Sequence, residues 1–174
     1  KLKPAFASTG SVTAGNSSQT TDGAAATLLM SEEAVKKYGL KPIAKLVAYT
    51  VAGCRADEMG VGPAYAIPKL LKMVGLKPTD IGIYEINEAF ASQAIYSAQQ
   101  IGLGDKKYWA SDSDSRIINV NGGAIALGHP LGCTGAKLCA QLMTMMQKKG
   151  AKYGVESMCI GGGMGAAALF ELCE

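Results

Sequence analysis

The sequence predicts an α/β fold in which helices cover a mixed β-sheet. Short β-rich segments alternate along the chain with segments whose apolar residues recur at helical spacing. Glycine and proline residues mark many of the junctions between these segments. The 174 residues are 48% hydrophobic and 18% charged, which is enough apolar chain to bury the core of about one domain.

The first 51 residues are predicted to form a loop, an apolar run, a helix and a strand, in that order. Residues 1–22 are rich in Ser, Thr, Gly and Asn and predict a loop. The uncharged run 24–30 is expected to form a buried helix or strand. Ser31 followed by two glutamates predicts a helix start, and Gly39 its end. The segment 43–51 is β-rich and predicts a strand.

The middle of the chain predicts a helix, a strand and a second helix. The helix covers residues 63–74, ends at Gly75, and places one apolar face toward the core: Ile67, Leu70, Leu71 and Val74. Residues 81–86 predict a strand, and a helix is expected over 88–100. The polar segment 104–116 is expected to be a surface loop without a functional role.

The last part predicts a long helix over residues 134–149 and two final strands. Its methionines are expected to pack in the core rather than to line a ligand site. The strands are expected over residues 154–159 and 166–172. Since strands and helices continue to alternate, the α/β prediction holds over the whole chain.

Composition excludes several classes of function. The net charge of +3 and the 6% aromatic content argue against nucleic-acid binding. No apolar stretch is long enough for a membrane span. One histidine and five cysteines without a CxxC pair argue against a zinc site, so no metal is expected. The cysteine pattern favours a reduced intracellular protein. The chain begins at Lys1 rather than Met, so its natural N-terminus is expected to precede it.

Three short segments contain the candidate catalytic residues. His129 lies between glycine-rich turns and suits acid/base chemistry, although a surface loop is the alternative. Asn87 is predicted at the junction of a strand and a helix, where a simple N-cap is the alternative. Cys159 precedes three glycines and can exchange a proton, whereas an inert buried cysteine is the alternative.

Together these segments resemble the C-terminal half of a thiolase. The family pattern has an NEAF-type motif, a GHP motif and a CxG motif, which match residues 87–90, 128–130 and 159–161. The resemblance divides the chain into a remnant of the N-terminal half, residues 1–31, and a C-terminal domain, residues 32–174. It implies a thiolase-like layered fold.

The resemblance also implies roles for the matched residues. The histidine activates the nucleophile and contributes to an oxyanion hole, and the cysteine removes or returns a proton at the acetyl carbon. Asn87 would fix a water or polarise a carbonyl, and Gly161 would offer a backbone donor. By position, four further residues would contact coenzyme A or the acyl group: Ser18 and Ala14 along the pantetheine arm, and Met59 and Phe90 in the acyl pocket.

The implied activity is cleavage of 3-ketoacyl-CoA to acetyl-CoA and a shortened acyl-CoA, or the reverse Claisen condensation. CoA thioesters would be substrates, with no permanently bound cofactor. None of the five cysteines falls at the place of the family's nucleophile, so the chain alone is expected to be inactive. We therefore expect it with the missing N-terminal half or in a larger assembly, as a dimer or tetramer.

The rival hypothesis is a half-thiolase that serves as a structural or CoA-binding subunit. This subunit would not need to catalyse the reaction. Finding the half that bears the nucleophile, either in the same polypeptide or tightly bound to this chain, would distinguish the enzyme from the subunit. For the enzyme, a mitochondrion or peroxisome is the expected compartment rather than the cytosol.

Overall fold

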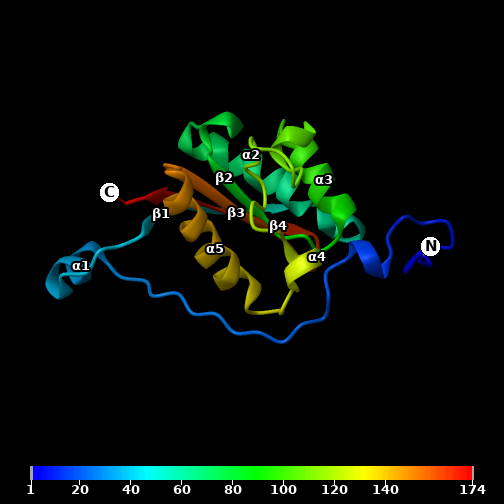
Figure 1. The fold of residues 1–174 in the computed structure, drawn as a ribbon, viewed down its shortest axis with the longest axis horizontal. Helices are drawn as coiled ribbons and strands as arrows, with labels where there is room; N and C mark the ends of the chain where they lie inside the picture. The colour runs from blue at the N-terminus through cyan, green and yellow to red at the C-terminus, as the bar shows by residue number, and fades with distance from the viewer. Residues whose placement is uncertain (1, 174) are drawn as a thin grey trace.

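The structure is a computed structural model that describes residues 2–173 (Figure 1). Its centre is a four-stranded sheet in the order β1-β4-β3-β2. The strands are β1 (Ala44–Gly53), β2 (Ile83–Ile86), β3 (Tyr153–Ile160) and β4 (Met164–Leu172). β4 runs antiparallel to both of its neighbours, whereas β2 and β3 are parallel. The predicted mixed sheet of an α/β fold is therefore confirmed.

Helices α2 (Gly62–Val74) and α3 (Ala91–Gln100) pack on one face of this sheet, and α5 (Thr134–Lys149) packs on the other. Helices α1 (Glu32–Tyr38) and α4 (Ala124–Leu127) do not belong to these two layers. One apolar cluster joins α2 and α3 to the sheet and includes Leu70 and Tyr84. A second joins α5 to the opposite face through Leu142 and Met146 (Figure 1). The methionines of α5 thus belong to the core, as predicted, because burying them removes apolar surface from water.

The helix ends follow their local sequence signals. Ser31 caps α1, its hydroxyl oxygen accepting a hydrogen bond from the amide of Ala34 at 3.2 Å. Gly39, Gly75 and Gly150 follow α1, α2 and α5 with φ between 62° and 71°, a left-handed conformation that suits glycine. The predicted ends of these three helices are confirmed.

The apolar run 24–30 is the main departure from the sequence prediction. These residues form neither helix nor strand, and Leu28 and Leu29 are about four-fifths exposed, at 80% and 78%. In Figure 1 the segment passes below the body of the fold as an extended chain. The prediction of a buried helix or strand is wrong for this structure, because residues 24–29 are exposed and the run has no regular secondary structure.

Two smaller differences lie next to the candidate site. Helix α3 begins at Ala91 rather than near residue 88, since Phe90 is extended and Glu88 bonds to residues far along the chain. The short helix α4 was not predicted, because four residues carry too little periodicity. The described residues contain no helix long and apolar enough to cross a membrane.

Candidate active site

Asn87 and His129 meet in space although 42 residues separate them. Asn87 follows β2 directly, is 1% exposed, and donates its backbone amide to the Ser157 carbonyl at 2.9 Å. Its side-chain Nδ2 lies 3.4 Å from Nε2 of His129. The N-cap of α3 is Phe90, so capping does not explain the asparagine. The strand end instead places its amide against the histidine ring.

Thr134, the first residue of α5, sets the orientation of the His129 ring. Its hydroxyl lies 2.6 Å from Nδ1 of His129 and 3.0 Å from the Pro130 carbonyl. Because that carbonyl can only accept, the hydroxyl proton points to it and the hydroxyl oxygen faces Nδ1. This assigns the ring proton to Nδ1. Nε2 is then the unprotonated ring nitrogen, and its lone pair faces Nδ2 of Asn87.

The surroundings of His129 keep its imidazole neutral near pH 7. Partial burial lowers the pKa of His129, and the positive charge of Lys137 lowers it further. The Lys137 ammonium is held nearby because it donates to the Gly128 carbonyl at 2.9 Å. A neutral ring with an open Nε2 is ready to accept a proton from a thiol or hydroxyl group.

The loop that carries His129 is tied to the end of β2 through Glu88. One carboxylate oxygen of Glu88 accepts from Nδ2 of Asn119 at 2.7 Å, and the other from the Ile125 amide at 3.3 Å. Gly123 is required here, since a side chain at that position would collide with the Glu88 carboxyl group. Glu88 therefore acts as a structural tie between the NEAF segment and α4.

Asn119 is a site residue that sequence analysis missed. It has a positive φ of 48°, and its side chain pairs with the backbone of Ile86 through both the N–H, at 2.8 Å, and the C=O, at 2.9 Å. It thus extends the edge of the sheet beside Asn87. Thr134 was also missed, although a hydroxyl five residues after the only histidine, at a helix start, was a usable signal.

Cys159 lies on β3, the strand next to Asn87. It pairs with Gly165 of β4 and comes two residues after Ser157, which bonds to the Asn87 amide. Burial raises the pKa of the Cys159 thiol, so the group holds its proton at neutral pH. Among the described residues no hydrogen bond joins Cys159 to His129. Gly161 opens the exposed turn that follows β3.

The N-terminal segment crosses the site and connects two of its motifs. The Ser18 amide donates to the Ala89 carbonyl at 2.9 Å, and the His129 amide donates to the Gln19 carbonyl at 3.3 Å. Ser18 is half-buried at this crossing. Ala14 is exposed and begins a short 3-10 helix, Ala14–Asn16. The predicted CoA-arm segment therefore runs directly over the NEAF and GHP loops.

The two predicted acyl-pocket residues occupy different elements. Phe90 is half-buried, and its ring packs edge-on against Phe6 with centroids 5.8 Å apart. Met59 is half-buried in the 3-10 helix Ala56–Val61, which packs on α3 and on β3 and β4. The structure thus joins Phe90 to the N-terminal segment, and it places Met59 at the same end of the sheet, because β1, β2 and β3 all run in one direction.

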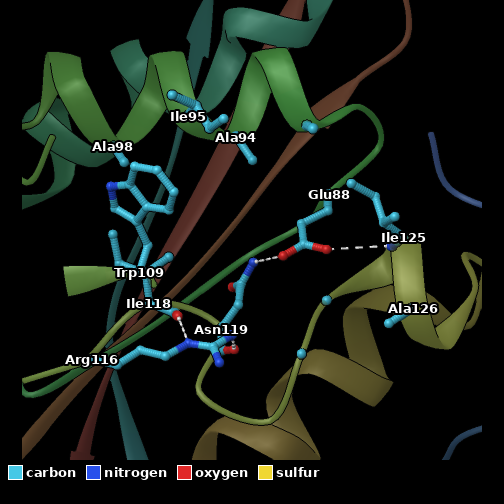
Figure 2. Close-up of a pocket in the computed structure, with 13 residues that line it drawn as sticks. Glu88, Ala94, Ile95, Ala98, Trp109, Arg116, Ile118, Asn119, Ile125 and Ala126 are labelled. Atoms are coloured by element: carbon cyan, nitrogen blue, oxygen red, sulfur yellow. Dashed lines mark hydrogen bonds between the residues drawn. The ribbon is translucent and has the colours of Figure 1, made fainter. Parts of the chain in front are cut away.

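A cavity of about 290 Å³ lies between α3, α4 and the loop 104–118 (Figure 2). Its walls are mostly apolar, and Figure 2 shows Glu88 at one end and Arg116 at the other. The loop 104–116 was predicted as a surface insertion without a role, yet it contributes Trp109 and Arg116 to this wall. Asn87, His129 and Cys159 are not part of the lining.

The described residues contain no group of three His, Cys, Asp or Glu side chains that could hold a metal ion.

The fold is that of an α/β protein in which Asn87, at the end of β2, meets the His129 ring. The model of the thiolase C-terminal domain matches residues 40–172, and that of the thiolase N-terminal domain matches residues 1–33. The chain belongs to the thiolase family.

Known proteins show the same similarity. The chain is 53% identical over 172 residues to 3-ketoacyl-CoA thiolase of Bacillus subtilis, covering 99% of the chain and 41% of that protein. It is 52% identical to human peroxisomal 3-ketoacyl-CoA thiolase, with 98% of the chain and 38% of that protein covered. The chain thus spans about two fifths of the length of these relatives.

Solved structures match the fold closely. Bacillus anthracis acetyl-CoA acetyltransferase gives a TM-score of 0.90 at 44% identity, over 99% of this chain and 41% of that one. Human mitochondrial 3-ketoacyl-CoA thiolase in complex with CoA gives 0.85 at 39% identity, over 100% and 42%. The dimeric peroxisomal thiolase of Saccharomyces cerevisiae gives 0.87 at 45% identity, over 99% and 40%.

Proposed function

We propose that this chain supplies the acid/base part of a thiolase active site. The reaction is thiolytic cleavage of 3-ketoacyl-CoA to acetyl-CoA and a shortened acyl-CoA, or the reverse condensation. One observation carries the proposal: Nδ2 of Asn87 lies 3.4 Å from a His129 ring whose Nδ1 faces Thr134 at 2.6 Å. Such an arrangement leaves Nε2 as a positioned base.

The proton transfers follow from the states of the two groups. Neutral His129 accepts the proton of a nucleophilic thiol, whose sulfur then bonds to the keto carbon of the substrate while the carbonyl π electrons move to its oxygen. The carbonyl re-forms as the neighbouring carbon–carbon bond breaks, and the electron pair of that bond passes to the acetyl-CoA fragment as an enolate. Cys159 gives its proton to that carbon, which suits a thiol whose pKa is raised by burial. The proton held by His129 then returns to the Cys159 thiolate. The thiol of a second coenzyme A takes the acyl group, which gives the shortened acyl-CoA and restores the nucleophilic thiol.

Asn87 and the turn after β3 supply polar groups for the developing negative charge. The Asn87 amide donates toward Nε2 in this structure and is placed to orient a water or a thioester carbonyl there. We assign Gly161 as a backbone donor, because it lies in the exposed turn two residues after Cys159. These roles rest on position at the strand ends.

We place the pantetheine arm of coenzyme A along the segment that crosses the site. Ser18 and Ala14 belong to that segment, while Phe90 and Met59 supply the apolar wall for the acyl chain. The structure of the human mitochondrial relative with CoA supports a CoA thioester as the ligand class. The ligand is a substrate, and no permanently bound cofactor is proposed.

The working protein requires more chain than these residues. We propose that residues 1–31 belong with an N-terminal thiolase half and residues 32–174 form the C-terminal domain. The exposed side chains of Leu28 and Leu29 support a partner there, since an uncharged apolar run is costly to leave in water. We propose a dimer, because the yeast relative is dimeric. We propose a peroxisome or mitochondrion as the compartment, because the human relatives are named as peroxisomal and mitochondrial.

The second candidate, a non-catalytic half-thiolase, is favoured by the same exposed segment, because binding alone would explain it. The test is acetoacetyl-CoA cleavage by the protein that contains this chain together with its N-terminal half. His129→Ala should lower kcat by about 100-fold or more. Gln147→Ala, at an exposed position of α5, is the matched control and should leave kcat unchanged. Near-normal turnover in a folded His129→Ala protein would contradict the proposal.

A further inference from the structure

Two buried glutamates lie side by side on the adjacent strands β2 and β3. Glu85 of β2 and Glu156 of β3 are partners in the parallel register, and they are 0% and 8% exposed. Ile83, two residues before Glu85, packs with Leu142 of α5, so the carboxyl groups lie on the α5 face of the sheet. The acid/base roles proposed above use neither of them.

Helix α5 contacts both carboxyl groups. Nε2 of Gln141 donates to Oε2 of Glu85 at 3.0 Å, and the Cys139 thiol donates to Oε2 of Glu156 at 2.9 Å. Oε1 of Glu85 is buried without a hydrogen-bond partner among the described residues. An ionised carboxylate with an unpartnered oxygen costs more there than a protonated carboxyl group does.

The charges around the pair do not neutralise it. Glu88 and Arg116 act on Glu85 with opposite signs, and the ladder position of β4 opposite Glu156 is Ala168. Arg116 donates instead to the backbone carbonyls of Ile118 and Asn119. Burial is the largest cause that raises the pKa of Glu85 and of Glu156, each to about 7. Two adjacent buried carboxyl groups favour holding at least one proton.

The same helix holds the His129 loop at three points. Thr134 faces Nδ1 of the ring, Lys137 donates to the Gly128 carbonyl at 2.9 Å, and Gln141 donates to the Gly122 carbonyl at 3.1 Å. Gln141 therefore bonds both to the Glu85 carboxyl and to the loop that leads to His129. A shift of α5 away from the sheet would move Thr134 and the ring with it.

We propose that Glu85 and Glu156 form a proton-holding pair that fixes α5 on the sheet and, through Thr134, positions His129. Both are positioning residues, and their catalytic consequence rests on the proposed function. Loss of the pair's protons places uncompensated charge under α5. The pair thus makes the geometry of the acid/base site depend on protons bound away from it.

The sign of the pH effect is fixed by the direction of these pKa values. Both folded-state values lie above the usual 4.3 of an unfolded glutamate, so the folded state binds more protons between about pH 4.5 and pH 7. Stability from the pair is full below that window and is lost as pH rises through it. The pKa of His129 is lowered, so its contribution to stability rises with pH instead of falling. The effect of the glutamates is therefore isolated by comparing variants with the wild type.

The experiment compares melting temperatures of the complete protein containing this chain from pH 5 to pH 8. The difference between the Glu85→Gln/Glu156→Gln variant and the wild type should rise in favour of the variant by about 3 °C or more up to pH 7. Glu171→Gln, at a surface carboxylate paired with Lys45, should show no such rise. A difference that stays constant with pH would overturn the proposal.

Two further readouts keep the test decisive if the double variant does not fold. Carbon-13 NMR of labelled glutamate in the wild type should find two carboxyl groups that titrate near pH 7, and titration of all glutamates below pH 5 would overturn the proposal. In Glu156→Gln the titration of Glu85 should move to lower pH, because the negative charge of Glu156 that raises the pKa of Glu85 is removed. The melting and NMR results do not depend on turnover, so they stand apart from the His129→Ala test.

Discussion

The body of the fold and the N-terminal segment achieve order in different ways. Residues 44–173 are held by an apolar core on each face of a sheet, with Leu142 and Tyr84 fully buried. Residues 2–31 have no such core, and contact the body where Ser18 and Gln19 bond across the NEAF and GHP loops. The body contains the proposed acid/base groups, whereas the segment contains the proposed CoA contacts. The proposed catalytic groups thus lie on the part of the chain that has a packed core.

Proteolysis should reveal the largest difference between the two regions. Trypsin has no target between Lys3 and Lys36, so thermolysin, which cleaves before Leu28 and Leu29, is the suitable protease. In the chain alone, cleavage within residues 22–31 should be at least about 1,000-fold faster than within the sheet, because only the sheet must unfold first. Equal rates in the two regions would remove the distinction.

Core truncation should separate the same regions by stability. Leu142→Ala should lower the free energy of unfolding by about 2–5 kcal/mol, since it leaves a cavity between α5 and the sheet. Leu28→Ala, at a residue 80% exposed, should change it by less than about 0.5 kcal/mol in the chain alone. Urea titration measures both, and a large effect at Leu28 would mean that the segment is packed.

A smaller effect is expected where α5 meets the site. Thr134→Val removes the hydroxyl that faces Nδ1 of His129, and should lower kcat of the complete enzyme by about 10-fold. Thr134→Ser keeps the hydroxyl and should retain most of the activity. The position is buried, so similar melting temperatures for both variants are needed as a control. If the valine and serine variants gave equal kcat values, the Thr134 hydroxyl would not be what orients the His129 ring.

The sequence predicted the elements whose signals are local. The apolar spacing in α5, the glycines after three helices and the alternation into β3 and β4 all depend on neighbouring residues. The chemistry of Asn87, His129 and Cys159 was also visible as motifs. The structure brings Asn87 to His129 and places Cys159 on the adjacent strand, and their catalytic roles stay predictions.

The remaining features depend on distant partners. Asn119 forms hydrogen bonds to the backbone of Ile86, 33 residues away, and no local sequence pattern predicts that contact. Glu88 is drawn out of the predicted helix by Asn119 and Ile125. The run 24–30 looked buried because it is apolar, but burial requires a partner surface that the described residues do not provide.

We propose that Cys159 and His129 divide the proton transfers and that the acyl group is attached to another residue. This proposal is tested most directly by exchange of the acetyl α-protons with deuterated water in the complete enzyme, comparing wild type with Cys159→Ala. We predict that the variant loses exchange by about 100-fold or more while still forming the acyl-enzyme. Exchange at the wild-type rate, or a stable acyl group trapped on Cys159 itself, would contradict this division.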